Sequence, residues 1–322
     1  MRGALRLAGV PAIVALAAAP AWAAGGLAVL IEPAAGIAPI YRLIASARHS
    51  VEMTMYELAD ATAEQALAAD AARGVRVRVI LDGGSHDRSL NRPAFGYLAS
   101  HRVAVRWASR EFYLTHEKAI VVDGATAAVM TLNLESRYYS STRDFALIDT
   151  RPADVAAIAA TFAADWAGRP IAPQAGSGEL LWSPGAQARL ESLIDAARRR
   201  LDVESEEMDS RGIEAALAAA SRRGVAVRVV MTANSAYAPA LAALAAGGVQ
   251  VRLYARSASL YIHAKLIVVD ARRAFLGSQN FSTASLQYNR ELGVVTTDPA
   301  VIGAVEATFA ADFAGATPIA PR

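Results

Sequence analysis

The sequence predicts an α/β protein made of two similar lobes, each a mixed β-sheet flanked by helices. Three observations lead to this fold class: an internal repeat, β-branched runs that follow helix-stop signals, and alanine-rich stretches typical of helices. The 322 residues suffice for one large domain or two of ordinary size. Hydrophobic residues make up 54% and charged residues 19%, a balance that favours a packed core over extensive disorder.

The repeat divides the chain into halves of the same construction. Two segments of the first half return 150 residues later and a third returns at an offset of 147: Val51–Leu58 as Leu201–Met208, Arg73–Ile80 as Arg223–Val230, and Ala160–Gly168 as Ala307–Gly315. Such self-similarity over long segments is typical of two units of one architecture.

Each half alternates strands with helices. Strands are expected where β-branched residues alternate after an Arg-Gly pair or form short apolar runs, at Val75–Leu81, Ile120–Val122, Val225–Met231 and Leu266–Val269. Helices are expected in alanine-rich stretches, at Ala61–Ala72, Val155–Trp166 and Ile213–Ser221. The chain therefore divides into a first lobe at 24–168, a Pro- and Gly-containing linker at 169–178 and a second lobe at 179–322.

Residues 1–23 resemble an export signal. Arg2 and Arg6 precede an apolar run, and Ala21-Trp22-Ala23 supplies the small-x-small cleavage pattern. The apolar run is shorter than the roughly 20 residues that span a bilayer, so cleavage near Ala23 is expected, with a retained anchor as the alternative. The protein is therefore expected to be exported, to the periplasm or the medium.

Charge and cysteine content exclude several classes of protein. Without residues 1–23 the chain has as many basic as acidic residues, because that segment contains two arginines and no acid. Such neutrality does not favour a general nucleic-acid binder, although a local basic groove remains compatible with it. The chain has no cysteine, so a disulfide framework, a thiolate nucleophile and a cysteine-based metal site are all excluded.

The strongest functional pattern is a set of polar residues that occurs twice with identical spacing. Counted from the histidine, the other five positions lie at +2, +7, +15, +17 and +28: His116, Lys118, Asp123, Thr131, Asn133 and Asp144 in the first half, and His263, Lys265, Asp270, Ser278, Asn280 and Glu291 in the second. A single His-x-Lys is weak evidence. A duplicated fold alone would not require a repeated His, Lys and Asn, because cores rarely contain them.

The two motif lysines are the only lysines in the chain, which has 30 arginines. A compact ammonium on a flexible stem suits a crowded phosphate site better than a planar guanidinium does. Lysine and asparagine donors suit the charge that develops on a phosphodiester in its transition state. One histidine can attack phosphorus while the other protonates the leaving oxygen and later activates water or an alcohol. This chemistry requires no metal and no cofactor.

The two His-x-Lys-x4-Asp copies, with Gly277-Ser278-x-Asn280 after the second, resemble the phospholipase D superfamily over nearly the whole mature chain. The resemblance implies a pseudo-twofold pair of α/β lobes with one active site between them and a phosphohistidine intermediate. It implies His116 as nucleophile and His263 as general acid/base, an assignment that the near symmetry of the motifs leaves reversible. It also implies that each downstream carboxylate orients the histidine of the other lobe, Glu291 with His116 and Asp144 with His263. Asn133, Asn280, Thr131 and Ser278 would bind the phosphate, and Asp123 and Asp270 would support local structure.

The motif recognises only the phosphodiester, so several functions remain open. The favoured one is a phospholipase D-like hydrolase of phospholipid head groups, working at a membrane surface, with transfer to alcohols as a variant. The alternatives are an exported nuclease, a cardiolipin-synthase-like phosphatidyltransferase and a non-catalytic protein that binds phosphate ligands. Because both motifs lie in one chain, a monomer is expected. Tyr56, Glu57, Glu206 and Glu207 follow equivalent strands, and the sequence leaves open whether they line the site or face solvent.

Overall fold

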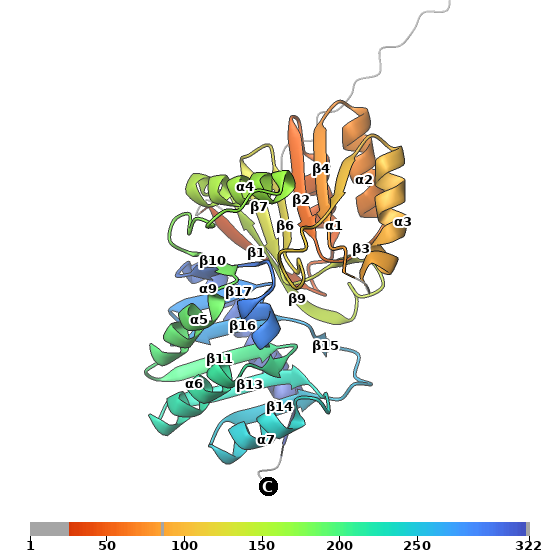
Figure 1. Cartoon of the computed structure of the whole chain (residues 1–322). Coiled ribbons are helices and arrows are strands. Elements are labelled where there is room, and N and C mark those ends of the chain that lie inside the picture. Colours follow the sequence, from red (N-terminus) through yellow and green to blue (C-terminus); the bar gives the residue numbers. More distant parts are fainter. Residues whose placement is uncertain (1–25, 85–86, 320–322) are drawn as a thin grey trace, which may run out of the picture.

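The structure, a computed structural model, describes residues 26–84 and 87–319 and contains two similar α/β lobes (Figure 1). The first lobe comprises β1 (Leu27–Glu32), α1 (Ala38–Ala45), β2 (Ser50–Met55), β3 (Leu58–Ala59), α2 (Ala61–Ala72), β4 (Arg76–Leu81), α3 (Asp87–Ser100), β5 (Ala104–Trp107), β6 (Lys118–Val122), β7 (Thr126–Met130), β8 (Leu134–Glu135), β9 (Thr142–Asp149) and α4 (Pro152–Ala167). The expected signal segment at 1–23 lies outside the described residues.

The second lobe repeats this order with additional short elements. It comprises β10 (Leu180–Ser183), α5 (Ala186–Asp195), β11 (Arg200–Ser205), β12 (Met208–Asp209), α6 (Arg211–Arg222), β13 (Ala226–Thr232), α7 (Ala238–Ala246), β14 (Gln250–Tyr254), β15 (Tyr261–Ile262), β16 (Lys265–Val269), β17 (Arg273–Gly277), β18 (Phe281–Ser282), α8 (Thr283–Gln287), β19 (Glu291–Thr296), α9 (Pro299–Gly315) and β20 (Thr317–Pro318). The expected linker, residues 169–178, runs between α4 and β10.

The two large sheets have matching strand orders. The first runs β1-β9-β7-β6-β2-β4-β5 and the second β10-β19-β17-β16-β11-β13-β14-β20. In each, a parallel part (β2, β4 and β5, or β11, β13 and β14) adjoins an antiparallel part. The prediction of two mixed sheets flanked by helices is therefore confirmed.

The predicted elements appear where the sequence pattern placed them. The helix expected at Ala61–Ala72 is α2, which begins after Asp60, whose carboxylate accepts the backbone N–H of Thr62 at 2.9 Å. The other two expected helices lie within α4 and α6, and the four expected strands correspond to β4, β6, β13 and β16. Each motif lysine is the first residue of its strand, at the end that faces the other lobe's motif.

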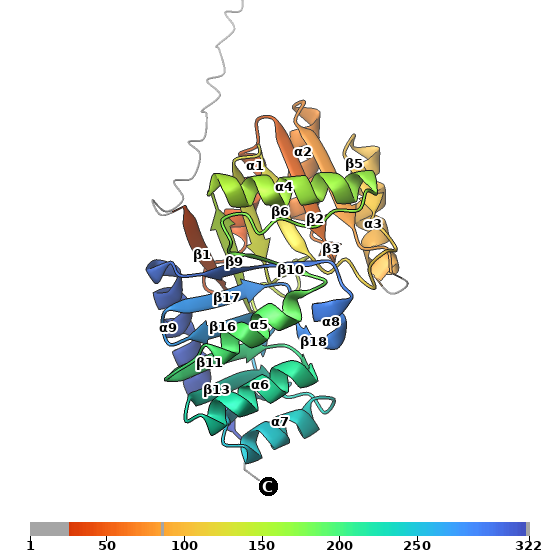
Figure 2. The same cartoon turned by 60° about the vertical axis from the view of Figure 1, so that its left-hand side comes forward.

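One apolar core joins the lobes. It contains side chains from β6, β7 and β9 of the first sheet and from β16, β17 and β19 of the second, together with α4 and α9. The opposite faces of the sheets carry separate cores, covered by α1, α2 and α3 in one lobe and by α5, α6 and α7 in the other (Figure 2). The lobes therefore share a buried face, which holds their strand ends in fixed relation. No helix within 26–84 and 87–319 is long and apolar enough to cross a membrane.

The motif aspartates have matching structural contacts. The Asp123 carboxylate accepts backbone N–H groups from Arg48, His49 and Ser50, the shortest at 2.7 Å, and Asp270 does the same for residues 198–200. Both aspartates have a positive φ, 53° and 52°. Each carboxylate thus ties the turn after β6 or β16 to the start of the neighbouring strand.

Replacing Asp123 with alanine is expected to destabilise the protein by about 2 kcal/mol, because several charge-assisted hydrogen bonds are lost and hydrogen bonds to charged groups contribute about 1.5–3 kcal/mol. Urea unfolding followed by circular dichroism measures the change. Asp195→Ala is the control, since the exposed Asp195–Arg223 pair at 3.4 Å contributes under about 1 kcal/mol. Equal stability of the two variants would contradict this role for Asp123.

Candidate active site

The first motif histidine, His116, is held by the second lobe. Its backbone N–H donates to the carbonyl oxygen of Arg290 at 3.0 Å, and its Nδ1 lies 2.8 Å from Oε2 of Glu291. His116 is only 7% exposed. The segment before β6 therefore runs beside the start of β19, and this places the imidazole against the other lobe's carboxylate.

The second motif histidine, His263, is held in the same way by the first lobe. β15 pairs with β9 of the first lobe, and the backbone N–H of His263 donates to the carbonyl oxygen of Arg143 at 3.2 Å. Nδ1 of His263 lies 2.7 Å from Oδ1 of Asp144. The pairing of each histidine with the opposite lobe's carboxylate is the one that the resemblance implied.

Further hydrogen bonds keep both carboxylates in place. Glu291 accepts from the Ser285 hydroxyl at 2.5 Å and from the Asn289 amide at 3.0 Å, while Asp144 accepts from the Thr131 hydroxyl at 2.6 Å. Burial opposes ionisation of Glu291 and Asp144, but the histidine partners, the lysines and these donors outweigh it and hold the pKa of each carboxyl below its usual value. An ionised carboxylate accepts the Nδ1 proton of its histidine, which directs Nε2 to the chemistry.

The motif lysines are among the most buried large side chains described. Lys118 is 1% exposed and Lys265 is fully buried, and each ammonium donates to the backbone carbonyl of its own motif histidine at 2.6 Å. Burial lowers the pKa of Lys118 to about 7, with the nearby charge of Lys265 contributing and that of Glu291 opposing. Two ammonium groups therefore lie at fixed positions beside the two imidazoles.

The lowered pKa of Lys118 predicts pH-dependent binding of a phosphodiester. The ammonium is charged below pH 7 and neutral above it, so the inhibition constant of dimethyl phosphate, which remains a monoanion, should rise by up to about tenfold per pH unit above 7. Inhibition assays from pH 5.5 to 9 measure this. Lys118→Met should bind weakly with a much flatter profile. A wild-type profile that matches the variant's would contradict the assignment.

Two residues expected at the phosphate have hydrogen-bond partners within the protein. Thr131 is 1% exposed, and its hydroxyl donates to Asp144 and accepts the backbone N–H of Phe145 at 2.8 Å. Ser278 is fully buried, and its hydroxyl exchanges hydrogen bonds with the backbone of Leu292. A hydroxyl has one proton, and here both protons are donated within the protein, so the two hydroxyls support Asp144 and β19. Their contact with the phosphate stays a prediction.

The motif asparagines retain hydrogen-bonding capacity. Asn133 donates to Oε2 of Glu57 at 2.9 Å, and Asn280 is 5% exposed. Among the described residues, Oδ1 of each asparagine is buried without a hydrogen-bond partner. Their role at the phosphate remains a prediction.

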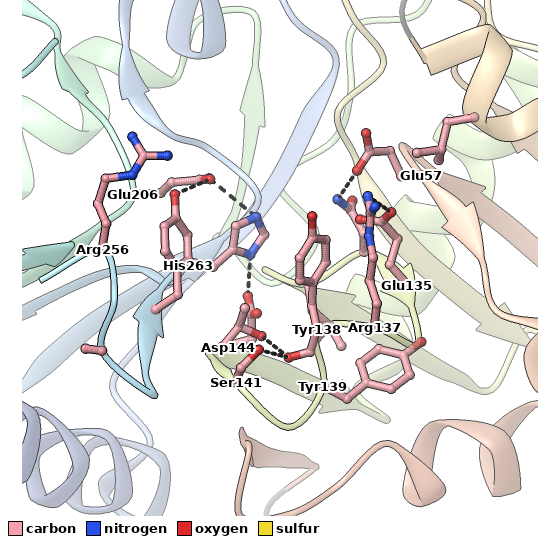
Figure 3. Close-up of a pocket in the computed structure, with 16 residues that line it drawn as sticks. Glu57, Glu135, Arg137, Tyr138, Tyr139, Ser141, Asp144, Glu206, Arg256 and His263 are labelled. Atoms are coloured by element: carbon pink, nitrogen blue, oxygen red, sulfur yellow. Dashed lines mark hydrogen bonds and ion pairs between the residues drawn. The ribbon is translucent and has the colours of Figure 1, made fainter. Parts of the chain in front are cut away.

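A cavity of about 590 Å³ opens beside His263 (Figure 3). Asp144, Asn133 and Glu206 contribute to its wall, together with tyrosines and arginines from both lobes: Tyr138, Tyr139, Tyr261, Arg137 and Arg256. The cavity gives the second motif histidine access to a polar ligand.

The sequence left Tyr56 and Glu206 unassigned, yet both contact the motifs. The Tyr56 ring lies 4.5 Å from the imidazole of His116 at an interplanar angle of 64°, and Nζ of Lys118 lies 4.8 Å from the same ring. Glu206 pairs with Lys265 at 2.9 Å. Tyr56 and Glu206 occupy equivalent positions in the two repeats. A position-by-position comparison of the repeats would therefore have shown that one half has a tyrosine where the other has a glutamate.

The arrangement brings two imidazoles, each with an ionised carboxylate at Nδ1, together with two ammonium groups to the junction of the lobes. Such a set can attack phosphorus, stabilise the charge on the phosphoryl oxygens and move a proton to or from the leaving oxygen. The site therefore has groups suited to phosphodiester transfer.

Comparison with known proteins agrees with this chemistry. A family model described as "Cardiolipin synthase, PLD-like domain" matches the chain twice, over residues 40–166 and 190–313. These matches cover more than half of the chain, which therefore belongs to this family and to the phospholipase D superfamily. It is an enzyme of the phosphodiesterase and phosphatidyltransferase class.

The chain is similar to cardiolipin synthase A of Pseudomonas aeruginosa (strain LESB58), with 27% identity over an alignment of 353 residues that covers 98% of this chain and 72% of the relative. Cardiolipin synthase A of Pseudomonas putida (strain W619) is 28% identical over 346 residues, covering 94% and 71%. Among solved structures, phosphatidylserine synthase of Haemophilus influenzae Rd KW20 shares the fold with a TM-score of 0.69 and 15% identity, covering 92% of this chain and 88% of that one. Polyphosphate kinase from Porphyromonas gingivalis has a TM-score of 0.66 and 14% identity over 88% of this chain and 50% of its own.

Proposed function

We propose that the protein is a phosphatidyltransferase that moves the phosphatidyl group of a phospholipid to an alcohol through a phosphohistidine. The observation that carries the proposal is the composite site of two carboxylate-paired imidazoles and two buried lysines. The similarity to cardiolipin synthases over 98% of the chain favours transfer over the head-group hydrolysis that the sequence alone favoured. Hydrolysis is the same chemistry with water as acceptor.

The proposed reaction proceeds in two displacements. In the first, Nε2 of His116 attacks phosphorus, the bond to the leaving oxygen breaks, and His263 gives its Nε2 proton to that oxygen. In the second, an alcohol oxygen attacks phosphorus, its proton passes to His263, and the phosphorus–nitrogen bond breaks. Lys118 and Lys265 offset the charge on the phosphoryl oxygens in both steps.

The test uses purified mature protein with phosphatidylglycerol vesicles in EDTA. Lipid products are separated and quantified with and without added glycerol, and plasmid DNA and labelled RNA are incubated in parallel. Accumulation of diphosphatidylglycerol ahead of phosphatidic acid is the expected result, and His116→Ala should form neither. Phosphatidic acid as the sole product would show that the protein hydrolyses the lipid and does not transfer the phosphatidyl group. Nucleic-acid cleavage without lipid turnover would show that the protein is a nuclease.

Three further proposals concern the setting of this activity. The segment at 1–23 directs export, the substrate is met at a membrane surface, and the chain works as a monomer because it carries both motifs. Size-exclusion chromatography with light scattering tests whether the chain is a monomer. N-terminal sequencing of the protein recovered from the periplasm or medium tests whether it is exported.

A further inference from the structure

The two halves of the site differ at one position. Tyr56 follows β2 in the first lobe and Glu206 follows β11 in the second, each one residue beyond the strand residue that faces the motif lysine, Met55 or Ser205. The first position therefore brings a neutral aromatic ring to His116, whereas the second brings a carboxyl group to His263. This is a difference of charge in a site that is otherwise closely matched.

Glu206 contacts both residues of its motif. Its Oε2 lies 2.9 Å from Nζ of Lys265 and 3.4 Å from Nε2 of His263, and Oε1 accepts from the Tyr261 hydroxyl at 3.3 Å. Burial opposes ionisation of Glu206, but His263 and Lys265 outweigh it and hold the pKa of its carboxyl well below the usual range. Glu206 is therefore an anion at the cavity wall.

Both ring nitrogens of His263 consequently face carboxylates. Asp144 lies at Nδ1 and Glu206 at Nε2, on opposite sides of the ring (Figure 3). A neutral imidazole has one N–H and would turn a lone pair toward one of these anions, whereas the imidazolium turns an N–H toward each. Among the positive groups, Lys265 pairs with Glu206, and Arg256 lines the same cavity as His263. Lys118 and His116 also interact electrostatically with Glu206.

His116 has a different environment. Glu291 accepts at its Nδ1, but Tyr56 stands where Glu206 stands in the other half. Burial lowers the pKa of the His116 imidazole, with the charges of both lysines contributing and that of Glu291 opposing. A neutral imidazole with its proton on Nδ1 has its lone pair on Nε2, the form that can attack phosphorus.

We infer that Glu206 is a positioning residue that divides the two roles: it keeps His263 in the protonated form that serves as acid, and so leaves the nucleophilic role to His116. This inference rests on the proposed function. Glu206 gains and loses no proton in the cycle. The proton that His263 gives to the leaving oxygen in the first displacement returns from the alcohol in the second. At 3.4 Å the ion pair leaves room for a substrate oxygen to compete for the Nε2 proton.

The test is nitrogen-15 NMR of protein labelled at histidine, at pH 7 and without substrate. The wild-type spectrum should show His263 protonated on both nitrogens and His116 neutral, with each resonance assigned by substituting that histidine. In Glu206→Gln the His263 signals should shift to those of a neutral ring, and the transfer rate should fall about 10²- to 10⁴-fold, the usual contribution of a general acid. Glu207→Gln removes the same charge one residue away and should leave the His263 signals unchanged.

A second variant covers the case in which Glu206→Gln does not fold. Glu206→Tyr introduces the residue that the first lobe already holds at this position, and it should also neutralise His263. With the two halves alike, the covalent adduct, located by mass spectrometry after an alkaline quench, should appear on both histidines rather than on His116 alone.

A neutral His263 in the wild-type protein, or a doubly protonated one in both variants, would overturn the inference. Since the spectrum needs no substrate, it separates this failure from that of the proposed function. Absence of lipid turnover with the expected spectrum would overturn the proposed transfer reaction and leave the effect of Glu206 on His263 standing.

Discussion

His116→Ala should lose at least about 10⁴-fold in turnover, because the variant has no nucleophile to form the phosphohistidine. The buried lysines remain and still bind the diester, so the loss should fall on kcat more than on KM. A phosphodiester of 4-nitrophenol gives the rate by absorbance, and mass spectrometry after an alkaline quench detects the adduct. Neither a burst nor an adduct is expected.

His263→Ala provides the matched control, since it removes the other imidazole from the same junction. The nitrophenolate leaves without a proton, so this variant should still form the adduct on His116 with the activated diester while losing turnover of phospholipids. The reverse pattern, with an adduct in His116→Ala and none in His263→Ala, would exchange the roles of the two histidines.

Glu291→Gln is expected to lower turnover by about 10³- to 10⁴-fold although the residue touches no reacting atom. An ionised carboxylate holds the Nδ1 proton of His116 and so keeps the lone pair on Nε2, whereas an amide can present a donor there and favour the other tautomer. Pre-steady-state rates of adduct formation with the nitrophenyl diester measure the effect directly.

Two further variants test whether the loss depends on the charge of the carboxylate and on which histidine it contacts. Ser285→Ala removes one donor to Glu291 but leaves its charge, and we expect it to lose less than about tenfold. Asp144→Asn acts through His263, so the activated leaving group should largely rescue it, whereas Glu291→Gln should remain slow with any leaving group. Equal rescue of both variants would show that the carboxylates do not serve different histidines in different roles.

The sequence predicted the fold well because the chain contains two copies of one unit. Strand and helix patterns recur at matched positions, so one half supports the interpretation of the other. The identity of the site was also predictable, since His116, Lys118 and their second copies keep identical spacings. The hydrogen-bond partners of Thr131 and Ser278 were not predictable, because spacing does not reveal which way a hydroxyl points at the end of a strand.

By itself, the sequence determined the two-lobed α/β class, the paired motif and the chemistry of a phosphodiester site. The family resemblance implied which carboxylate meets which histidine, but only the tertiary structure shows how. Those contacts form where β15 pairs with β9 and where Thr115 bridges to Arg290 across the lobes. The tertiary structure likewise brought Glu206 to His263, through the register of β11 against β16. Local pattern encodes which residues can do chemistry, whereas strand register and the shared core between lobes fix which of them come within hydrogen-bonding distance.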